Sequence, residues 1–151
     1  MKKPIQNNLV LELHVPDFGT VKQFYSKLGF EVISEDPVAE NPGYLVMKRK
    51  DPLGETIINF YGGDEKVYQH QHFKKFPHET PRGYATEITI PVSDIESLYK
   101  SLTETVPKNI VRELKEVIEN TTNGEVKWRD FRMIDPFGFY IRFTELIDWG
   151  Q

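Results

Sequence analysis

Residues 9–29 decide the fold, and they read LVLELHVPDFGTVKQFYSKLG. Residues 9–15 alternate between two faces, as in a half-buried β-strand. Asp17 follows directly and is a suitable N-cap for a helix. Apolar side chains then recur at helical spacing over residues 18–28, and Gly29 is the residue type that commonly ends a helix. We therefore predict a strand that leads straight into an amphipathic helix.

The same order of elements occurs twice along the chain. Val15-Pro16-Asp17 before the first helix is echoed by Val92-Ser93-Asp94 before a second helix. Asp51-Pro52-Leu53-Gly54 is echoed by Asp135-Pro136-Phe137-Gly138, and each of these turns precedes a strand. An internal repeat of this kind indicates two equivalent modules. Alternation and turn residues place the remaining elements, namely a helix over 95–102 and strands over 30–33, 44–47, 56–61, 87–92, 128–134 and 139–144.

Two details of the second module come from local patterns. Residues 110–118 carry an apolar stripe that fits a helix, whereas the repeat requires a strand here; the repeat favours the strand without excluding the helix. Residues 93–96, Ser-Asp-Ile-Glu, have the form of a capping box at the start of the second helix.

These elements predict a single α+β domain over residues 1–151. One module spans about 5–61, a polar linker about 62–82 and a second module about 83–147. Each module has the order βαβββ, and its curled mixed sheet buries one face under the helix and leaves the other face concave. Two concave faces set together would enclose a cavity for a small molecule. Strand parity assigns to the core beneath the helices Phe60, Phe139, Ile141 and Phe143.

Composition excludes several classes of function. The chain has 151 residues, of which 38% are hydrophobic and 13% aromatic, enough for one independently folding domain. The net charge of −4, without a basic cluster, argues against nucleic acid as a partner. The lack of cysteine removes disulfides and thiol nucleophiles. No apolar stretch is long enough to cross a bilayer, and the start lacks a signal-peptide pattern, so we expect a cytoplasmic protein with no membrane partner.

The motifs resemble those of a known superfamily. Val15-Pro16-Asp17 followed by residues 24–30, FYSKLGF, is similar to the first-helix signature of the glyoxalase, bleomycin-resistance and extradiol-dioxygenase group, the vicinal oxygen chelate superfamily. Residues 135–143, DPFGFYIRF, resemble its closing motif, and residues 128–136, WRDFRMIDP, resemble the bleomycin-resistance branch in particular. The resemblance covers about residues 9–145. It implies the glyoxalase/bleomycin-resistance fold, a small organic molecule as partner and a homodimer.

The metal-dependent enzymes of that group place His or Glu ligands at set points on the strands that line the cavity. Counted from the matching motifs, these points fall on Val10, Asn59 (to within one residue), Glu87 and Arg142. Val10 has no lone pair, Asn59 is a weak neutral ligand, and Arg142 is permanently positive. One carboxylate does not supply the three ligands that a catalytic metal generally needs. We therefore expect no metal or other cofactor, and we expect Glu87 and Arg142 to form an ion pair instead.

The residues expected to line the cavity lie on the polar face of their strands or could form aromatic walls around a flat ligand. Glu12 and His14 could bind or protonate a ligand, or could form an ordinary polar lining. His70, His72 and His78 suggest a metal site, but a solvated loop is the simpler interpretation. The complete set of expected cavity residues is Glu12, His14, Asn59, Tyr61, Glu87, Trp128, Tyr140 and Arg142.

Two functions fit these observations. The first is a metal-independent small-molecule binding protein, and the resemblance implies sequestration of an antibiotic or a related aromatic compound. The second is a lyase, isomerase or dioxygenase of the same superfamily, with metal ligands elsewhere or with Glu87 or His14 as proton acceptor. A regulatory scaffold is a weaker third, since a fold does not fix a function. Enzymatic activity stays open, although the residues at the ligand positions weigh against it.

Overall fold

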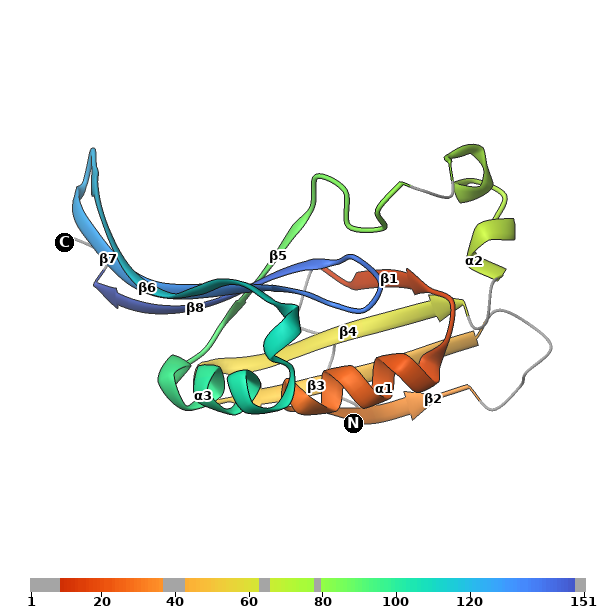
Figure 1. Cartoon of the computed structure of the whole chain (residues 1–151), viewed down its shortest axis with the longest axis horizontal. Coiled ribbons are helices and arrows are strands. Elements are labelled where there is room, and N and C mark those ends of the chain that lie inside the picture. The colour runs from red at the N-terminus through yellow and green to blue at the C-terminus, as the bar shows by residue number, and fades with distance from the viewer. Residues whose placement is uncertain (1–8, 37–42, 63–65, 78–79, 149–151) are drawn as a thin grey trace, which may run out of the picture.

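The computed structural model describes residues 9–36, 43–62, 66–77 and 80–148, which form two open four-stranded sheets, each with one helix packed on it (Figure 1). The first half contains β1 (Leu11–Val15), α1 (Phe18–Lys27), β2 (Phe30–Glu35), β3 (Gly43–Asp51) and β4 (Gly54–Gly62). The connecting segment contains α2 (Lys66–Gln69) and the 3₁₀ turn η1 (Phe73–Lys75). The second half contains β5 (Glu87–Pro91), α3 (Ile95–Thr105), the 3₁₀ turn η2 (Pro107–Asn109), β6 (Ile110–Thr121), β7 (Gly124–Ile134) and β8 (Tyr140–Asp148).

Both sheets have the same topology. Their strand orders are β1-β4-β3-β2 and β5-β8-β7-β6, with β1 parallel to β4, β5 parallel to β8 and the other neighbours antiparallel. This confirms the α+β fold with two βαβββ modules. The prediction that the sheets enclose a common cavity is wrong for the part of the chain that the structure describes. Both sheets stay open there, because the edge strands β1 and β5 each pair with a single neighbour.

One hydrophobic cluster runs through both modules, between each helix and the sheet face that it covers. Its largest fully buried side chains include Tyr25 of α1, Leu102 of α3 and Phe131 of β7. The residues that strand parity assigned to this core are all buried, as predicted: Phe60, Phe139, Ile141 and Phe143. Because successive strand residues alternate between faces, the polar residues next to them point away from the helices.

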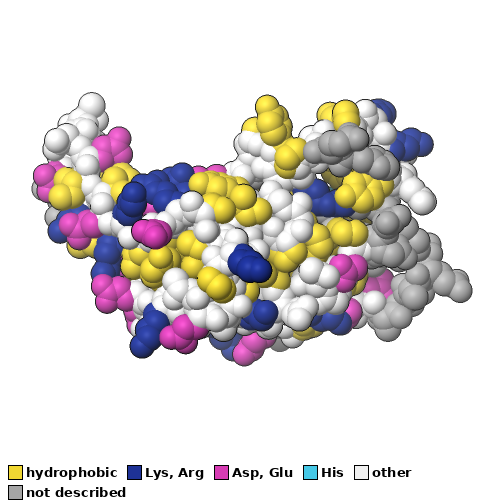
Figure 2. Space-filling view, viewed as in Figure 1, with side chains coloured by type: hydrophobic (Ala, Val, Ile, Leu, Met, Phe, Trp, Pro, Cys, Tyr) yellow, Lys and Arg dark blue, Asp and Glu magenta, His cyan; other side chains and the backbone are white. Residues whose placement is uncertain are grey.

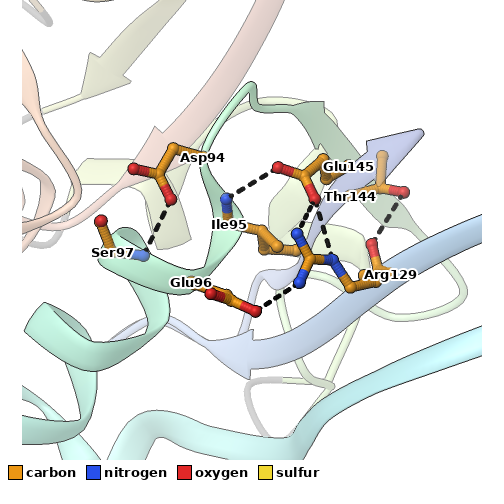
Figure 3. Close-up of polar contacts among 7 residues, drawn as sticks. All are labelled: Asp94, Ile95, Glu96, Ser97, Arg129, Thr144 and Glu145. Atoms are coloured by element: carbon orange, nitrogen blue, oxygen red, sulfur yellow. Dashed lines mark hydrogen bonds and ion pairs between the residues drawn. The ribbon is translucent and has the colours of Figure 1, made fainter. Parts of the chain in front are cut away.

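The two helices begin with equivalent caps. The Asp17 carboxylate accepts a hydrogen bond from the Thr20 backbone N–H at 2.7 Å, as predicted. In α3 the N-cap is Asp94, which accepts from the Ser97 N–H at 3.1 Å (Figure 3), so the predicted capping box that starts at Ser93 is wrong. Glu96 does not reach back to Ser93, because it forms an ion pair with Arg129 of β7.

Residues 110–118 belong to a strand, as the repeat favoured. The register between β6 and β7 shifts on both sides of Arg112, which breaks the simple two-residue alternation. This is the physical reason why the apolar residues of this segment also fit a helical stripe. At the other end of the chain, β1 starts at Leu11, two residues later than predicted, and Val10 lies outside it with 58% of its surface exposed.

The aspartate of each Asp-Pro-x-Gly turn accepts hydrogen bonds from the other module, in or just before its helix. Asp135 is 3% exposed and accepts a hydrogen bond from the Tyr25 hydroxyl of α1 at 2.9 Å, across 110 positions of sequence. Its other oxygen accepts from the backbone N–H groups of Phe137 and Phe139, at 2.9 and 2.8 Å. In the first module, Asp51 accepts from the backbone N–H and the hydroxyl of Ser93, both at 3.2 Å.

We predict that Tyr25→Phe lowers the free energy of unfolding by about 1–3 kcal/mol, because it leaves a buried carboxylate oxygen of Asp135 without its donor. Urea denaturation monitored by circular dichroism measures the change. Tyr84→Phe is the matched control. Tyr84 is 75% exposed, so the loss of its hydroxyl should leave no buried polar atom without a partner. Equal stability of the two variants would show that the Tyr25–Asp135 contact does not hold the modules together.

Candidate functional site

The structure has a pocket of about 400 Å³ beside β1. The segment that contains α2 and η1 stands over β1 (Figure 1) and forms the outer wall together with the residues that lead into β5. The lining is mainly apolar and aromatic, and consists of Leu11, Glu12, Leu13, His14, Tyr68, Phe73, Phe76, Pro77, Thr80, Pro81, Arg82, Tyr84, Thr86 and Phe139.

His14 lies at the centre of an aromatic cluster on the wall formed by β1. Its ring centroid is 4.6 Å from that of Phe73, 4.8 Å from that of Tyr61 and 5.1 Å from that of His70, all in edge-to-face geometry. Such contacts are the favoured arrangement of aromatic pairs and hold the imidazole in one orientation. The segment after β4 is therefore folded against the first sheet.

The pKa of His14 is lowered below its usual value, first by burial and then by the nearby charges of His70 and Arg82. The imidazole is therefore neutral near pH 7. Its Nε2 lies 3.4 Å from a carboxylate oxygen of Glu12, so Nε2 is the nitrogen that carries the proton. The other ring nitrogen, Nδ1, is buried without a hydrogen-bond partner and can only accept a proton or a hydrogen bond.

Arg82 closes one side of the pocket. Its guanidinium donates a hydrogen bond to the backbone carbonyl of His14 at 3.3 Å and lies over the Tyr68 ring, 4.5 Å from its centroid. The Nη2 atom is buried and has no hydrogen-bond partner. A guanidinium stays charged at any physiological pH, so Arg82 is a fixed positive donor next to the neutral imidazole.

Of the predicted cavity residues on the first sheet, Glu12 and His14 line this pocket. Asn59 and Tyr61 lie beside them on β4, where Asn59 pairs with Glu12 and Tyr61 with His14, but neither is part of the pocket lining. The wall contributed by Phe73, Phe76 and Tyr84 was missed, because the sequence around these aromatics is rich in polar residues and prolines.

The histidines of the connecting segment behave differently from one another. His70 is partly buried against His14 and stacks on Phe73 at 4.6 Å, so its interpretation as part of a solvated loop is wrong. Its Nδ1 accepts a hydrogen bond from the backbone N–H of His72, which orders this turn. His72 is exposed, as predicted, and His78 lies outside the described residues.

The predicted cavity residues of the second sheet form a separate group on the face that turns away from α3. Arg142 lies 3.7 Å from Glu87, which confirms the expected ion pair. Its shorter contact, at 2.8 Å, is with Asp130 of β7, a residue that the sequence did not single out. Asp130 is 1% exposed and also accepts a hydrogen bond from the Trp128 indole N–H at 3.0 Å.

Tyr140 completes this group. Its hydroxyl accepts a hydrogen bond from Arg132 at 3.5 Å, and the Arg132 guanidinium lies 5.9 Å from the centre of its ring. Arg132 is a second partner of Glu87, at 3.4 Å. These polar residues of the second sheet therefore form one network of ion pairs and hydrogen bonds. None of them lines the pocket beside β1.

The four positions at which the sequence resemblance suggested metal ligands do not fit a metal ion. Val10 precedes β1 and is mostly exposed, and Arg142 places a fixed positive charge where a cation would bind. The one carboxylate, Glu87, is taken up by ion pairs with Arg132 and Arg142. Within residues 9–36, 43–62, 66–77 and 80–148, no group of three or more His, Cys, Asp or Glu side chains could hold a metal.

Comparison with known proteins identifies the fold. No protein-family model matches the sequence, and no curated protein gives a significant match. The structure is similar to that of TioX from Micromonospora sp. ML1, which is 18% identical with a TM-score of 0.57 over 92% of this chain and 95% of that one. A glyoxalase/bleomycin resistance protein/dioxygenase from Alicyclobacillus acidocaldarius is 19% identical, with a TM-score of 0.58 over 95% and 96% of the two chains.

The fold also matches a bleomycin-binding protein in complex with bleomycin, which is 17% identical with a TM-score of 0.55 over 93% of this chain and 98% of that one. At these identities the likeness establishes the fold alone. The chain has the glyoxalase/bleomycin-resistance fold over nearly its whole length, as its motifs implied. None of the described helices is long and apolar enough to cross a membrane.

The lowered pKa of His14 predicts a pH dependence of stability. The unfolded chain takes up a proton at His14 near pH 6.5, whereas the folded chain resists it, so the free energy of unfolding falls as the pH drops below 6.5. From this one group the slope is at most about 1.4 kcal/mol per pH unit. Urea denaturation of the wild type and of His14→Gln between about pH 7.5 and 5.5, roughly one unit either side of 6.5, isolates the contribution of His14 to the free energy of unfolding. Parallel stability curves for the two proteins would contradict the assignment.

Proposed function

We propose that this protein binds a small organic molecule, without a resident metal, in the pocket between β1 and residues 68–77 and 80–86. The observation that carries the proposal is the pocket itself, whose volume of about 400 Å³ is typical of small-molecule sites, which range over roughly 300–1,000 Å³. Its apolar and aromatic walls provide contact area, and His14, Glu12 and Arg82 provide the few polar groups that would orient a ligand.

A flat, mainly apolar ligand suits these walls. Phe73 and Phe76 come from the segment over β1 and Leu11 from the strand below, so a planar ring can lie between apolar surfaces on both sides. Among the proteins with this fold is one solved with bleomycin bound, which supports a role in sequestering an antibiotic or a related aromatic compound in the cytoplasm. The ligand would meet an acceptor at His14 Nδ1 and a donor at Arg82 Nη2, two buried atoms of the pocket lining that have no hydrogen-bond partner among the described residues.

The uncharged fluorescent probe N-phenyl-1-naphthylamine tests the pocket. We expect its emission to rise on binding, and we expect Phe73→Ala to weaken binding about tenfold, since the loss of one aromatic contact costs on the order of 1.4 kcal/mol. Leu53→Ala is the matched control, because Leu53 is 65% exposed in the β3–β4 turn. Unchanged affinity in the Phe73 variant would refute the assignment of the pocket as the ligand site. Native mass spectrometry of the purified protein would identify any ligand that co-purifies.

We also propose a homodimer, which the resemblance implied. Apolar side chains stay exposed along the second sheet in the single chain, among them Val111 at 51%, Ile118 at 55% and Ile147 at 45%. Exposed apolar area on this scale favours burial against a second copy.

Light scattering after size exclusion should give about twice the chain mass of 17.7 kDa. Ile118→Asp should shift the protein toward the monomer, because it places a charge in the proposed interface. Leu53→Asp adds the same charge at an exposed turn and should leave the dimer intact. A wild-type protein that stays monomeric at micromolar concentration would rule out this assembly.

A metal-free acid–base enzyme is the second candidate. The observation that favours it is the neutral His14, whose free Nδ1 is buried beside the pocket while Glu12 orients the ring through Nε2. This pair could take a proton from a bound molecule. Turnover of a co-purified ligand that is lost in His14→Gln, with binding of the probe retained, would favour the enzyme over the binding protein.

A further inference from the structure

Three arginines form a continuous row across the second sheet. Arg112 of β6 pairs directly with Arg132 of β7, and Arg132 pairs directly with Arg142 of β8. Like charges at directly opposed positions destabilise a sheet. Arginine does not lose its proton in proteins, so the chain cannot relieve this repulsion by neutralising a member of the row. The row therefore requires negative charge from elsewhere.

The chain supplies only part of that negative charge. Asp130 is held by Arg142 at 2.8 Å and lies 3.9 Å from Arg112, and Glu87 lies 3.4 Å from Arg132 and 3.7 Å from Arg142. These two carboxylates face three guanidinium groups. The row thus carries a net charge of about +1, in a protein whose overall charge is −4.

The hydrogen-bonding capacity of the row is also incompletely used. The Nε atoms of Arg132 and Arg142 are buried and have no hydrogen-bond partner. The side chains of Arg112, Arg132 and Arg142 are 35%, 24% and 22% exposed, so their guanidinium groups remain within reach of a ligand. Figure 2 shows Lys and Arg side chains gathered on the side of the second sheet away from α3. Lys115, which pairs with Asp130 in the sheet, adds a further positive charge to this face.

Aromatic rings flank the row. The Arg142 guanidinium lies 5.7 Å from the centre of the Trp128 ring, and that of Arg132 lies 5.9 Å from the centre of the Tyr140 ring. Guanidinium groups bind planar carboxylates through two parallel N–H donors. A ligand that carries both a carboxylate and an aromatic ring could therefore contact the arginines with one part and Trp128 or Tyr140 with the other.

We propose that the arginine row, Arg112–Arg132–Arg142, is a binding site for an aromatic carboxylate. The anion offsets the excess charge of the row, and its ring lies against the flanking aromatics. The site shares no residue with the lining of the pocket beside β1, so it stands or falls separately from the function proposed for that pocket.

Benzoate, titrated at low ionic strength and followed by isothermal calorimetry, is the direct probe. We expect benzoate to bind, with benzyl alcohol and benzylamine binding at least tenfold more weakly because they lack the negative charge. Acetate and inorganic phosphate separate the contribution of the ring from that of the charge. Binding of phosphate or acetate as tight as that of benzoate would overturn the aromatic part of the proposal, and equal binding of benzyl alcohol would overturn the anionic part.

Two substitutions locate the site. Arg112→Gln should weaken benzoate binding at least tenfold. Among the described residues, the one ion pair of Arg112 is its 3.9 Å contact with Asp130, so the variant should remain folded. Lys127→Gln is the matched control, because it removes one positive charge from β7 at a residue that pairs with the exposed Glu116. Similar affinities in both variants, or displacement of N-phenyl-1-naphthylamine by benzoate, would contradict the assignment of the arginine row as the site.

Discussion

The arrangement of the two modules depends on the buried contact between Tyr25 and Asp135. The Asp135 carboxylate is almost fully removed from water, and burial, the largest influence, raises its pKa. Three donors offset this cost, namely the Tyr25 hydroxyl and the backbone N–H groups of Phe137 and Phe139. Because the hydroxyl comes from the helix of the other module, the turn before β8 can have a satisfied carboxylate only when the two halves are docked. The Asp51–Ser93 contact provides the equivalent link on the other side.

When the modules are docked in this way, the polar and charged side chains of the strands lie on the sheet faces that the helices do not cover. The apolar faces of both sheets pack against α1, α3 and the other module. Polar residues of the same strands therefore point to the opposite face. The two outward faces then differ. Beside the first sheet, His14 of β1 and Arg82 of the segment before β5 line a pocket with aromatic walls. On the second sheet, Arg132 and its neighbours form a charged surface around the buried Asp130.

Proteins that share this fold at 17–19% identity include a bleomycin-binding protein and a glyoxalase/bleomycin resistance protein/dioxygenase. Proteins that share a fold can have different functions, because the function depends on the side chains present at the site. In this chain, Arg142 and Glu87 lie 3.7 Å apart on the second sheet and neutralise each other in part. The ion-pair network around Arg142 is a property of the side chains that the fold alone does not reveal.

The sequence by itself determined what depends on neighbouring residues: strand alternation and the core that it implies, the N-cap at Asp17, and the repeated turns that mark two modules. The Glu87–Arg142 pair was also predictable, because strand counting placed both side chains on one face. Only the tertiary structure decided the rest. Ser93 bonds to Asp51, 42 positions away, in place of capping its own helix, and His70 packs on His14 across 56 positions. Contacts between residues so far apart in sequence depend on how complete modules and connecting segments dock, and local patterns carry no information about that docking.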